Sequence, residues 1–176
     1  MSDINISVDG EERSYEKGTK LESIAREFQS RHKADIVLAM VNGKLRELTN
    51  VLEDDCNVQF IGTDTVCGIE TYRRSAVLMM MKAFYDICGE NNIDKIIVDY
   101  SLSKGYYCEL KGKISVSMDL LYEVKKHMED IVRRDIPIVK RTITTSEAVE
   151  RFRKHRMFDK EKLFKFRRGS NVNVYT

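Results

Sequence analysis

The chain has 176 residues, of which 42% are hydrophobic and 33% charged, and its formal net charge is +2. This composition is typical of a globular protein, and one proline with nine glycines argues against a long disordered linker. The longest apolar run, residues 76–81, is far shorter than the roughly 18 residues of a membrane-spanning helix. The N-terminus lacks the basic and apolar regions of a secretory signal, so we expect a cytoplasmic protein. Dispersed cysteines and histidines, without a C-x-x-C pair, predict neither a zinc site nor a disulfide framework.

Residues 1–62 predict a small domain of strands around one helix. Apolar residues alternate at 5–8, and Asp9-Gly10 marks a turn into a second strand at 13–15. Thr19, with Glu22 three residues later, has the pattern of a capping box and is the expected N-cap of a short amphipathic helix. Further strands are expected at 36–41, 44–48 and 57–61.

The order β-β-α-β-β-β within about sixty residues is that of a β-grasp (ubiquitin-like) fold. The Val41-Asn42-Gly43-Lys44 hairpin and the late strand at 58–61 resemble the TGS domain. That family is an N-terminal appendage of threonyl-tRNA synthetases, stringent-response synthetases and some GTPases. The resemblance covers residues 1–62 and implies a ligand- or RNA-contacting regulatory module without chemistry of its own. Glu53-Asp54-Asp55 is interpreted as a solvated turn rather than as a metal site.

The small polar residues 62–65 suggest a boundary to a second domain at 63–176. Apolar residues from Tyr72 to Ile87 recur at spacings of three and four, which predicts a helix over 68–88. Strands are expected at 93–99 and 105–111, with a short third strand or turn at 113–116. Ser117 is the expected N-cap of a helix that Asp135-Ile136-Pro137 ends, with its buried side formed by Met118, Leu121, Val124, Met128 and Ile131.

The last part of the chain predicts a strand at 138–142 and two short helices at 146–156 and 159–166, followed by no closing strand pattern. Residues 138–176 contain eleven Lys/Arg against four Asp/Glu, whereas residues 1–62 contain eight against twelve. This basic segment is either a solvated helical face or a surface for polyanions. Its candidate RNA contacts are Arg151, Arg153, Lys154, Arg156, Arg167 and Arg168, and it also supplies Lys160, Lys162 and Lys165. The helical spacing of Phe152, Phe158, Phe164 and Phe166 favours core packing over base stacking.

The segment 71–78 and the hairpin Gly105-Tyr106-Tyr107-Cys108 resemble the second N-terminal domain of threonyl-tRNA synthetases. The implied fold class is α+β, a β-grasp TGS domain followed by a synthetase-like domain with an antiparallel sheet. In that family the helix carries an H-x-x-x-H pair used for hydrolytic editing, and Arg74 and Leu78 stand at those positions here. An arginine stays protonated and a leucine neither donates nor accepts, so no catalytic or metal-binding residue is expected. The pocket could still bind an anion or another ligand, through Arg73, Arg74, Lys104, Tyr106 and Tyr107, unless the two arginines only face solvent.

The motif Tyr72-Arg73-Arg74-Ser75 and the residues 101–110 resemble the corresponding segments of bacterial uridine-kinase-like nucleoside kinases. In these proteins a TGS and synthetase-like region precedes a P-loop kinase domain. The resemblance implies a non-catalytic regulatory module whose partner is a C-terminal kinase domain that uses ATP and Mg²⁺, with tRNA or a small-molecule regulator as further partners. This chain has no G-x-x-x-x-G-K-[ST] motif, so no cofactor is expected within it, and its second domain is expected to be truncated.

Two other functions remain open from the sequence. The first is a tRNA- or RNA-binding N-terminal fragment of a threonyl-tRNA synthetase, for which the basic segment 138–176 is the main support. The second is a residual editing hydrolase, which needs a water-activating group that the residues do not supply.

Overall fold

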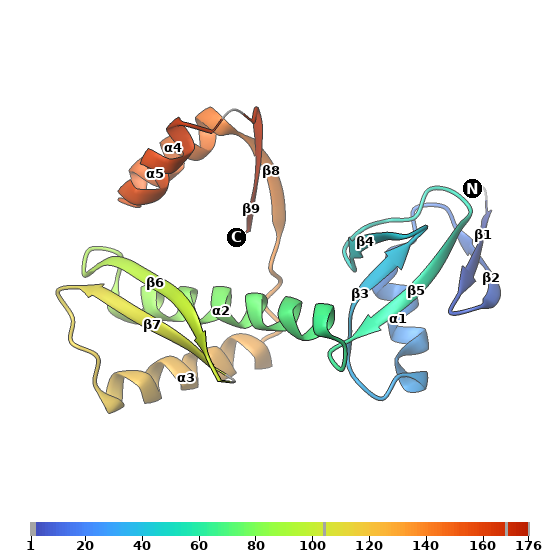
Figure 1. Cartoon of the computed structure of the whole chain (residues 1–176), viewed down its shortest axis with the longest axis horizontal. Coiled ribbons are helices and arrows are strands. Elements are labelled where there is room, and N and C mark those ends of the chain that lie inside the picture. Colours follow the sequence, from blue (N-terminus) through green and yellow to red (C-terminus); the bar gives the residue numbers. More distant parts are fainter. Residues whose placement is uncertain (1–2, 104, 168, 176) are drawn as a thin grey trace. The chain divides into compact units, whose positions relative to one another are not determined.

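The structure is a computed structural model that describes residues 3–103, 105–167 and 169–175 (Figure 1). Contacts between residues divide the chain into two compact units, Met1–Val77 and Leu78–Thr176. The division falls inside α2 (Val66–Cys88), a helix that begins in the first unit and ends in the second. The domain boundary expected at residues 62–65 lies just before this helix and stays a prediction.

The first unit is built around a mixed sheet with the strand order β2-β1-β5-β3-β4. The β1–β5 pair is parallel, and the β1–β2, β3–β4 and β3–β5 pairs are antiparallel. The sheet, with α1 and a short 3-10 helix, has the β-β-α-β-β-β order expected for a β-grasp fold. The elements are β1 (Asp3–Val8), β2 (Glu11–Glu16), α1 (Leu21–Phe28), η1 (Gln29–Arg31), β3 (Ile36–Val41), β4 (Lys44–Glu47) and β5 (Cys56–Gly62).

The core of this unit forms where α1 lies against one face of the sheet (Figure 1). The alternating residues Ile4, Ile6 and Val8 of β1 are all buried, as the period of two predicts. Leu21, Ile24, Ala25 and Phe28 of α1 cover them, with Val58 and Phe60 of β5 in the same cluster. Each branched or aromatic side chain buried in this way contributes about 1.5–3 kcal/mol to the hydrophobic stabilisation.

The turn chemistry of the first unit is confirmed at both predicted dipeptides. Asn42 has φ 47° and Gly43 has φ 75°, as a type I′ hairpin between β3 and β4 requires. Asp9 and Gly10 also have positive φ angles, between β1 and β2.

The predicted capping role of Thr19 is wrong. The helix α1 begins at Leu21 with Lys20 as its N-cap, and no side chain caps it. Instead, the first free N–H groups of the helix donate to backbone carbonyls of the loop after β4, from Leu21 to Asn50 (2.9 Å) and from Glu22 to Leu48 (2.8 Å). Thr19 itself closes the preceding turn, because its hydroxyl donates to the carbonyl of Glu16 at 2.6 Å.

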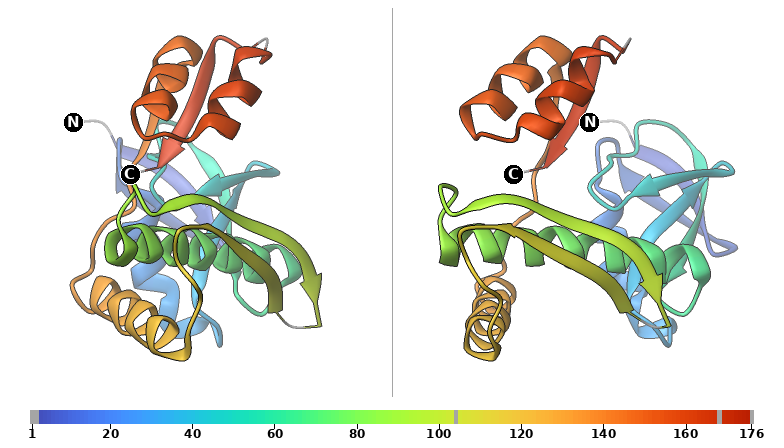
Figure 2. Two further views of the ribbon diagram at one scale, coloured as in Figure 1. Left: turned by 90° about the vertical axis from the view of Figure 1, so that its left-hand side faces the viewer. Right: turned by 60° about the vertical axis from the view of Figure 1, so that its left-hand side comes forward.

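In the second unit a β-hairpin and a helix pack against the C-terminal half of α2 (Figure 2). The antiparallel hairpin consists of β6 (Ile93–Leu102) and β7 (Gly105–Gly112), and the helix is α3 (Met118–Arg133). Their core contains Ala83, Phe84, Ile93, Ile96 and Val124. The predicted cap of α3 is confirmed, because the Ser117 hydroxyl accepts from the N–H of Leu120 at 3.2 Å.

Three details of this unit differ from expectation. Of the two alternatives for residues 113–116, the strand is wrong, because the partner strand β6 starts at Ile93, which already pairs with Gly112, and a bend follows at Lys113. The buried side of α3 is formed by Leu120, Val124 and Met128, whereas Met118 is 79% and Leu121 41% exposed. On α2 the predicted apolar stripe extends too far, because the core covers the helix only from Met80 onward and Tyr72 is 55% exposed.

The last part of the chain forms a helical hairpin beside a two-stranded antiparallel sheet. The elements are β8 (Lys140–Thr144), α4 (Thr145–Lys154), α5 (Phe158–Lys165) and β9 (Asn171–Tyr175). The two helices are confirmed. The first strand lies two residues later than expected, and β9 was not predicted at all. Its only sequence signal is the alternation of Val172 and Val174, and pairing with β8 buries Val172 against Ile143 and Ala148.

The aromatic residues of the helical hairpin divide into two groups. Phe152 and Phe164 lie against each other with ring centres 5.1 Å apart, beside the small core of β8, α4 and β9, as predicted. Phe158 and Phe166 are 57% and 79% exposed, so their predicted place in the core is wrong. The core here is too small to cover four phenylalanines, because among the described residues Ile143, Ala148 and Val172 alone form its buried centre.

Candidate functional site

The basic segment of the second unit, residues 138–176, is the strongest concentration of one charge in the chain. Two of its cations pair with Glu161, a residue of α5 that is only 8% exposed. Lys165 lies 2.9 Å and Arg153 3.0 Å from the same Glu161 oxygen. Their hydrogen bonds hold the pKa of Glu161 below its usual range, against a smaller opposing effect of burial. The Arg153–Glu161 pair thus joins α4 to α5, and Lys165 pairs with Glu161 within α5.

Other cations of this segment also have partners within the protein. Arg151 donates to Glu147 one turn earlier on α4 at 2.8 Å. The guanidinium of Arg167 lies 5.3 Å from the ring centre of Phe164. Arg156 donates to the side chain of Asn91 at 3.4 Å. Most of the arginines predicted to contact RNA are therefore already engaged, although such exposed contacts are weak enough to exchange for a phosphate.

A second set of cations in the basic segment is exposed and has no ion pair or hydrogen bond among the residues that the structure describes. These are Lys154 at the end of α4, Lys162 on α5 and Arg141 on β8. No signal in the sequence indicated Arg141, because the predicted contacts were chosen by the high charge density of the two helices and Arg141 lies on β8. Arg168, another predicted contact, lies outside the described residues. The unpaired cations are the groups best suited to bind phosphates, because they lose no internal partner on binding.

The residues predicted to bind an anion or a ligand are divided between the two compact units. Arg74 lies back along its own helix, donating to the Glu70 carbonyl at 3.3 Å and to the Thr71 hydroxyl at 3.4 Å. Arg73 is half-buried on the same helix, in the first compact unit. Tyr106 and Tyr107 are exposed on β7, in the second unit, where the Tyr107 ring stacks on Tyr100 with centres 5.2 Å apart. Lys104 lies outside the described residues. Ligand binding by this set stays a prediction.

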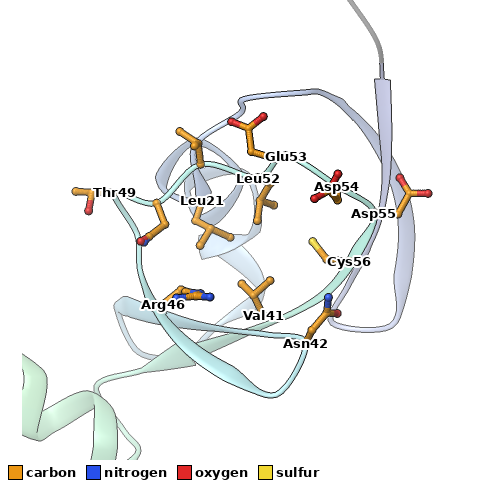
Figure 3. Close-up of a pocket in the computed structure, with 12 residues that line it drawn as sticks. Leu21, Val41, Asn42, Arg46, Thr49, Leu52, Glu53, Asp54, Asp55 and Cys56 are labelled. Atoms are coloured by element: carbon orange, nitrogen blue, oxygen red, sulfur yellow. The ribbon is translucent and has the colours of Figure 1, made fainter.

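The first unit contains a concavity of about 560 Å³ beside the β3–β4 hairpin (Figure 3). Leu21, Val41 and Leu52 form an apolar floor, with Arg46 on one side and the acidic turn 53–55 on the other. The sequence analysis had singled out only the acidic turn.

The side chains around this concavity largely stabilise the loop itself. Asp55 accepts a hydrogen bond from the backbone of Asn5 at 2.7 Å, and Glu53 pairs with Lys17 at 3.8 Å. Partial burial raises the pKa of the Cys56 thiol, and the nearby Asp55 and Asp54 carboxylates add to the shift. The thiol is therefore not activated as a nucleophile.

Comparison with known proteins supports the first of the three predicted resemblances, the TGS domain. The TGS domain family matches residues 5–62, the segment that carries the β-grasp sheet. Residues 5–62 form a TGS domain. This TGS domain ends with β5, four residues before α2 begins.

Similarity to threonine–tRNA ligases extends through the TGS domain and the residues that follow it. The ligase of Thermotoga neapolitana is 29% identical over 170 residues, which are 95% of this chain and 25% of that protein. The ligase of Thermotoga maritima is 27% identical over 95% of this chain, and that of Staphylococcus saprophyticus 25% identical over all of it. The chain spans about a quarter of the length of these curated relatives. It is similar to their N-terminal region, with a TGS domain followed by an α+β part that contains antiparallel sheets, which confirms the predicted fold class.

The comparisons correct the predicted nucleoside kinase. The relatives are named as tRNA ligases and not as uridine or nucleoside kinases, so neither that identity nor a kinase-domain partner has support. The residues behind the prediction, Tyr72 to Ser75 and the hairpin around Tyr106, lie in the part that aligns with the ligases, so they do not distinguish the two classes. Within the described residues, no helix is both long enough and apolar enough to cross a membrane.

Proposed function

We propose that this chain is a tRNA-binding region of a protein related to threonyl-tRNA synthetases, and that it holds tRNA without carrying out chemistry. The observation that carries the proposal is the similarity of 95% of the chain to threonine–tRNA ligases, which includes both compact units.

The charge distribution supports the proposal. The TGS domain is acidic, and residues 138–176 carry an excess of seven positive charges. A polyanion such as tRNA is attracted to a basic surface through release of its counter-ions. The exposed Lys154, Lys162 and Arg141 supply cations that no carboxylate of the described residues neutralises.

The proposal assigns no catalytic residue. Editing of a mischarged tRNA requires a group that moves a proton near neutral pH, and histidine is suited to this. The positions that resemble the editing helix of the family hold Arg74 and Leu78. Arg74 interacts with its own helix, and Leu78 is 37% exposed.

Binding of fluorescently labelled tRNA to the whole chain, measured by anisotropy over a salt series, tests the proposal. We expect saturable binding whose logarithmic affinity falls linearly with the logarithm of salt concentration. A DNA duplex of equal phosphate content is the control for general polyanion binding, and it should bind more weakly. Absence of tRNA binding at about 50 mM salt, where phosphate contacts are strongest, would contradict the proposed function.

A further inference from the structure

The second unit contains an apolar groove of about 570 Å³ that the tRNA proposal does not use. It lies between α2, α3 and the segment 136–138, which passes α2 on its way from α3 to β8 (Figure 1). Its apolar lining includes Leu78, Met79, Ile131, Ile136, Pro137 and Ile138. A concave, mostly apolar site with a few convergent polar groups is the usual form of a small-molecule site.

The polar groups of the groove are joined in one cluster. Asp86 of α2 interacts through one carboxylate oxygen with Lys82, one turn earlier, and through the other with His127 Nε2 of α3 at 3.0 Å. Burial is the largest single effect and disfavours the ionised carboxylate, but the hydrogen bonds and charges of Lys82 and His127 together hold the pKa of Asp86 below its usual range. Asp86 is therefore an anion at neutral pH, and each of its oxygens already has a donor.

The charge of this cluster decides which ligand it suits. Lys82 and Asp86 cancel, so the cluster is neutral with a neutral His127 and carries one positive charge with a protonated His127. Lys82 is an ammonium with three protons, of which Asp86 takes one, and its side chain is 65% exposed. The other charged residues of the lining, Arg134 and Asp135, are of opposite sign. A cationic head group would find no unsatisfied carboxylate at Asp86, whereas an anionic one would find donors at Lys82.

We propose that this groove binds a small organic anion with an apolar body. The body lies against the α2 and α3 side chains and the segment 136–138, and the anionic head is placed at Lys82 and His127. The site is independent of the proposed tRNA contacts, none of which lines the groove.

Two related dyes test the site on the whole chain. The first, 8-anilinonaphthalene-1-sulfonate, has an aromatic body and a sulfonate, and the second, N-phenyl-1-naphthylamine, has the same kind of body without the charge. Both gain fluorescence on entering an apolar site, so titration gives their affinities. We expect saturable binding of the sulfonate dye at one site per chain, tighter than binding of the neutral dye.

Three variants separate the two parts of the site. Lys82→Gln removes the cation and should weaken the sulfonate dye about two- to fivefold, the range for a largely exposed ion pair, without changing the neutral dye. Ile136→Ser, at a position that is 43% exposed, should weaken both dyes. Lys125→Gln, on α3 outside the groove and 74% exposed, is the matched charge control and should change neither.

The proposal is overturned if the sulfonate dye does not saturate, or if Lys82→Gln and Lys125→Gln have equal effects on it. Equal loss of both dyes in Lys82→Gln would also overturn it, because the anionic head would then make no specific contact. Since Lys82 is exposed, its substitution tests the site even if Ile136→Ser impairs folding.

Discussion

Replacing both Lys154 and Lys162 by glutamine should remove two phosphate contacts from the proposed tRNA interface. The two side chains are exposed on α4 and α5 and have no partner among the residues described, so their loss breaks no internal ion pair. By contrast, neutralising Arg153 would also leave Glu161 without one of its two cations, and an effect on binding could then come from the fold. The Lys154→Gln/Lys162→Gln variant therefore isolates the contribution of charge at the surface.

The size of the effect follows from counter-ion release. Each phosphate contact contributes about 0.7 to 0.9 to the magnitude of the slope of log affinity against log salt concentration. Loss of two contacts should therefore reduce the magnitude of this slope by about 1.4 to 1.8. If the electrostatic contribution vanishes near 1 M salt, each contact is worth about four- to sixfold in affinity at about 0.15 M. The double variant should bind tRNA about 15- to 30-fold more weakly at that salt concentration.

The assay is the tRNA anisotropy titration at four or more salt concentrations, with circular dichroism to show that the variants fold alike. The control is Lys33→Gln/Lys44→Gln, which makes the same change of net charge on the acidic TGS domain. The control should change affinity less than about twofold. If both double variants lose the same slope, binding depends on net charge and not on the basic segment, and the reasoning is refuted. An unchanged slope in Lys154→Gln/Lys162→Gln would refute it as well.

Two further predictions concern stability. Glu161→Gln should lower the urea midpoint of the chain at pH 7, because the carboxylate holds Arg153 and Lys165 together. Since the fold lowers the pKa of Glu161, this stabilisation is present above the pKa of an unfolded glutamate and is lost as pH falls through the folded-state value. The difference from wild type should therefore shrink towards pH 3, and an exposed control, Glu150→Gln, should show no such dependence. Gly43→Ala should destabilise the TGS domain by about 1–2 kcal/mol, because an L-residue is strained in the left-handed region. Gly43 has φ 75°, and a methyl group added there would meet open space, so backbone strain is the only cost; an unchanged urea midpoint would contradict this.

The sequence predicted those parts of the fold that depend on neighbours along the chain. The period-two alternation of Ile4, Ile6 and Val8 placed β1, and Asn42-Gly43 placed the β3–β4 turn, because both signals come from local stereochemistry. The Ser117 cap and the helical hairpin were found for the same reason. Short motifs indicated the synthetase-like part. They could not distinguish ligases from kinases, because the motif residues 72–75 and 101–110 lie in the region that aligns with the ligases.

For this protein, the sequence by itself determined most of the elements, the β-grasp order and the basic character of residues 138–176. The tertiary structure decided which groups satisfy one another over long separations. Carbonyls of the loop after β4 cap α1 in place of Thr19, and β8 turns the weak Val172–Val174 alternation into a strand. The tertiary structure also decided which cations have an internal partner, as Arg153 has in Glu161. It brought Asp86 and His127 together beside an apolar groove. These outcomes depend on which residues of different elements pair, and short-range patterns in the sequence do not predict that pairing.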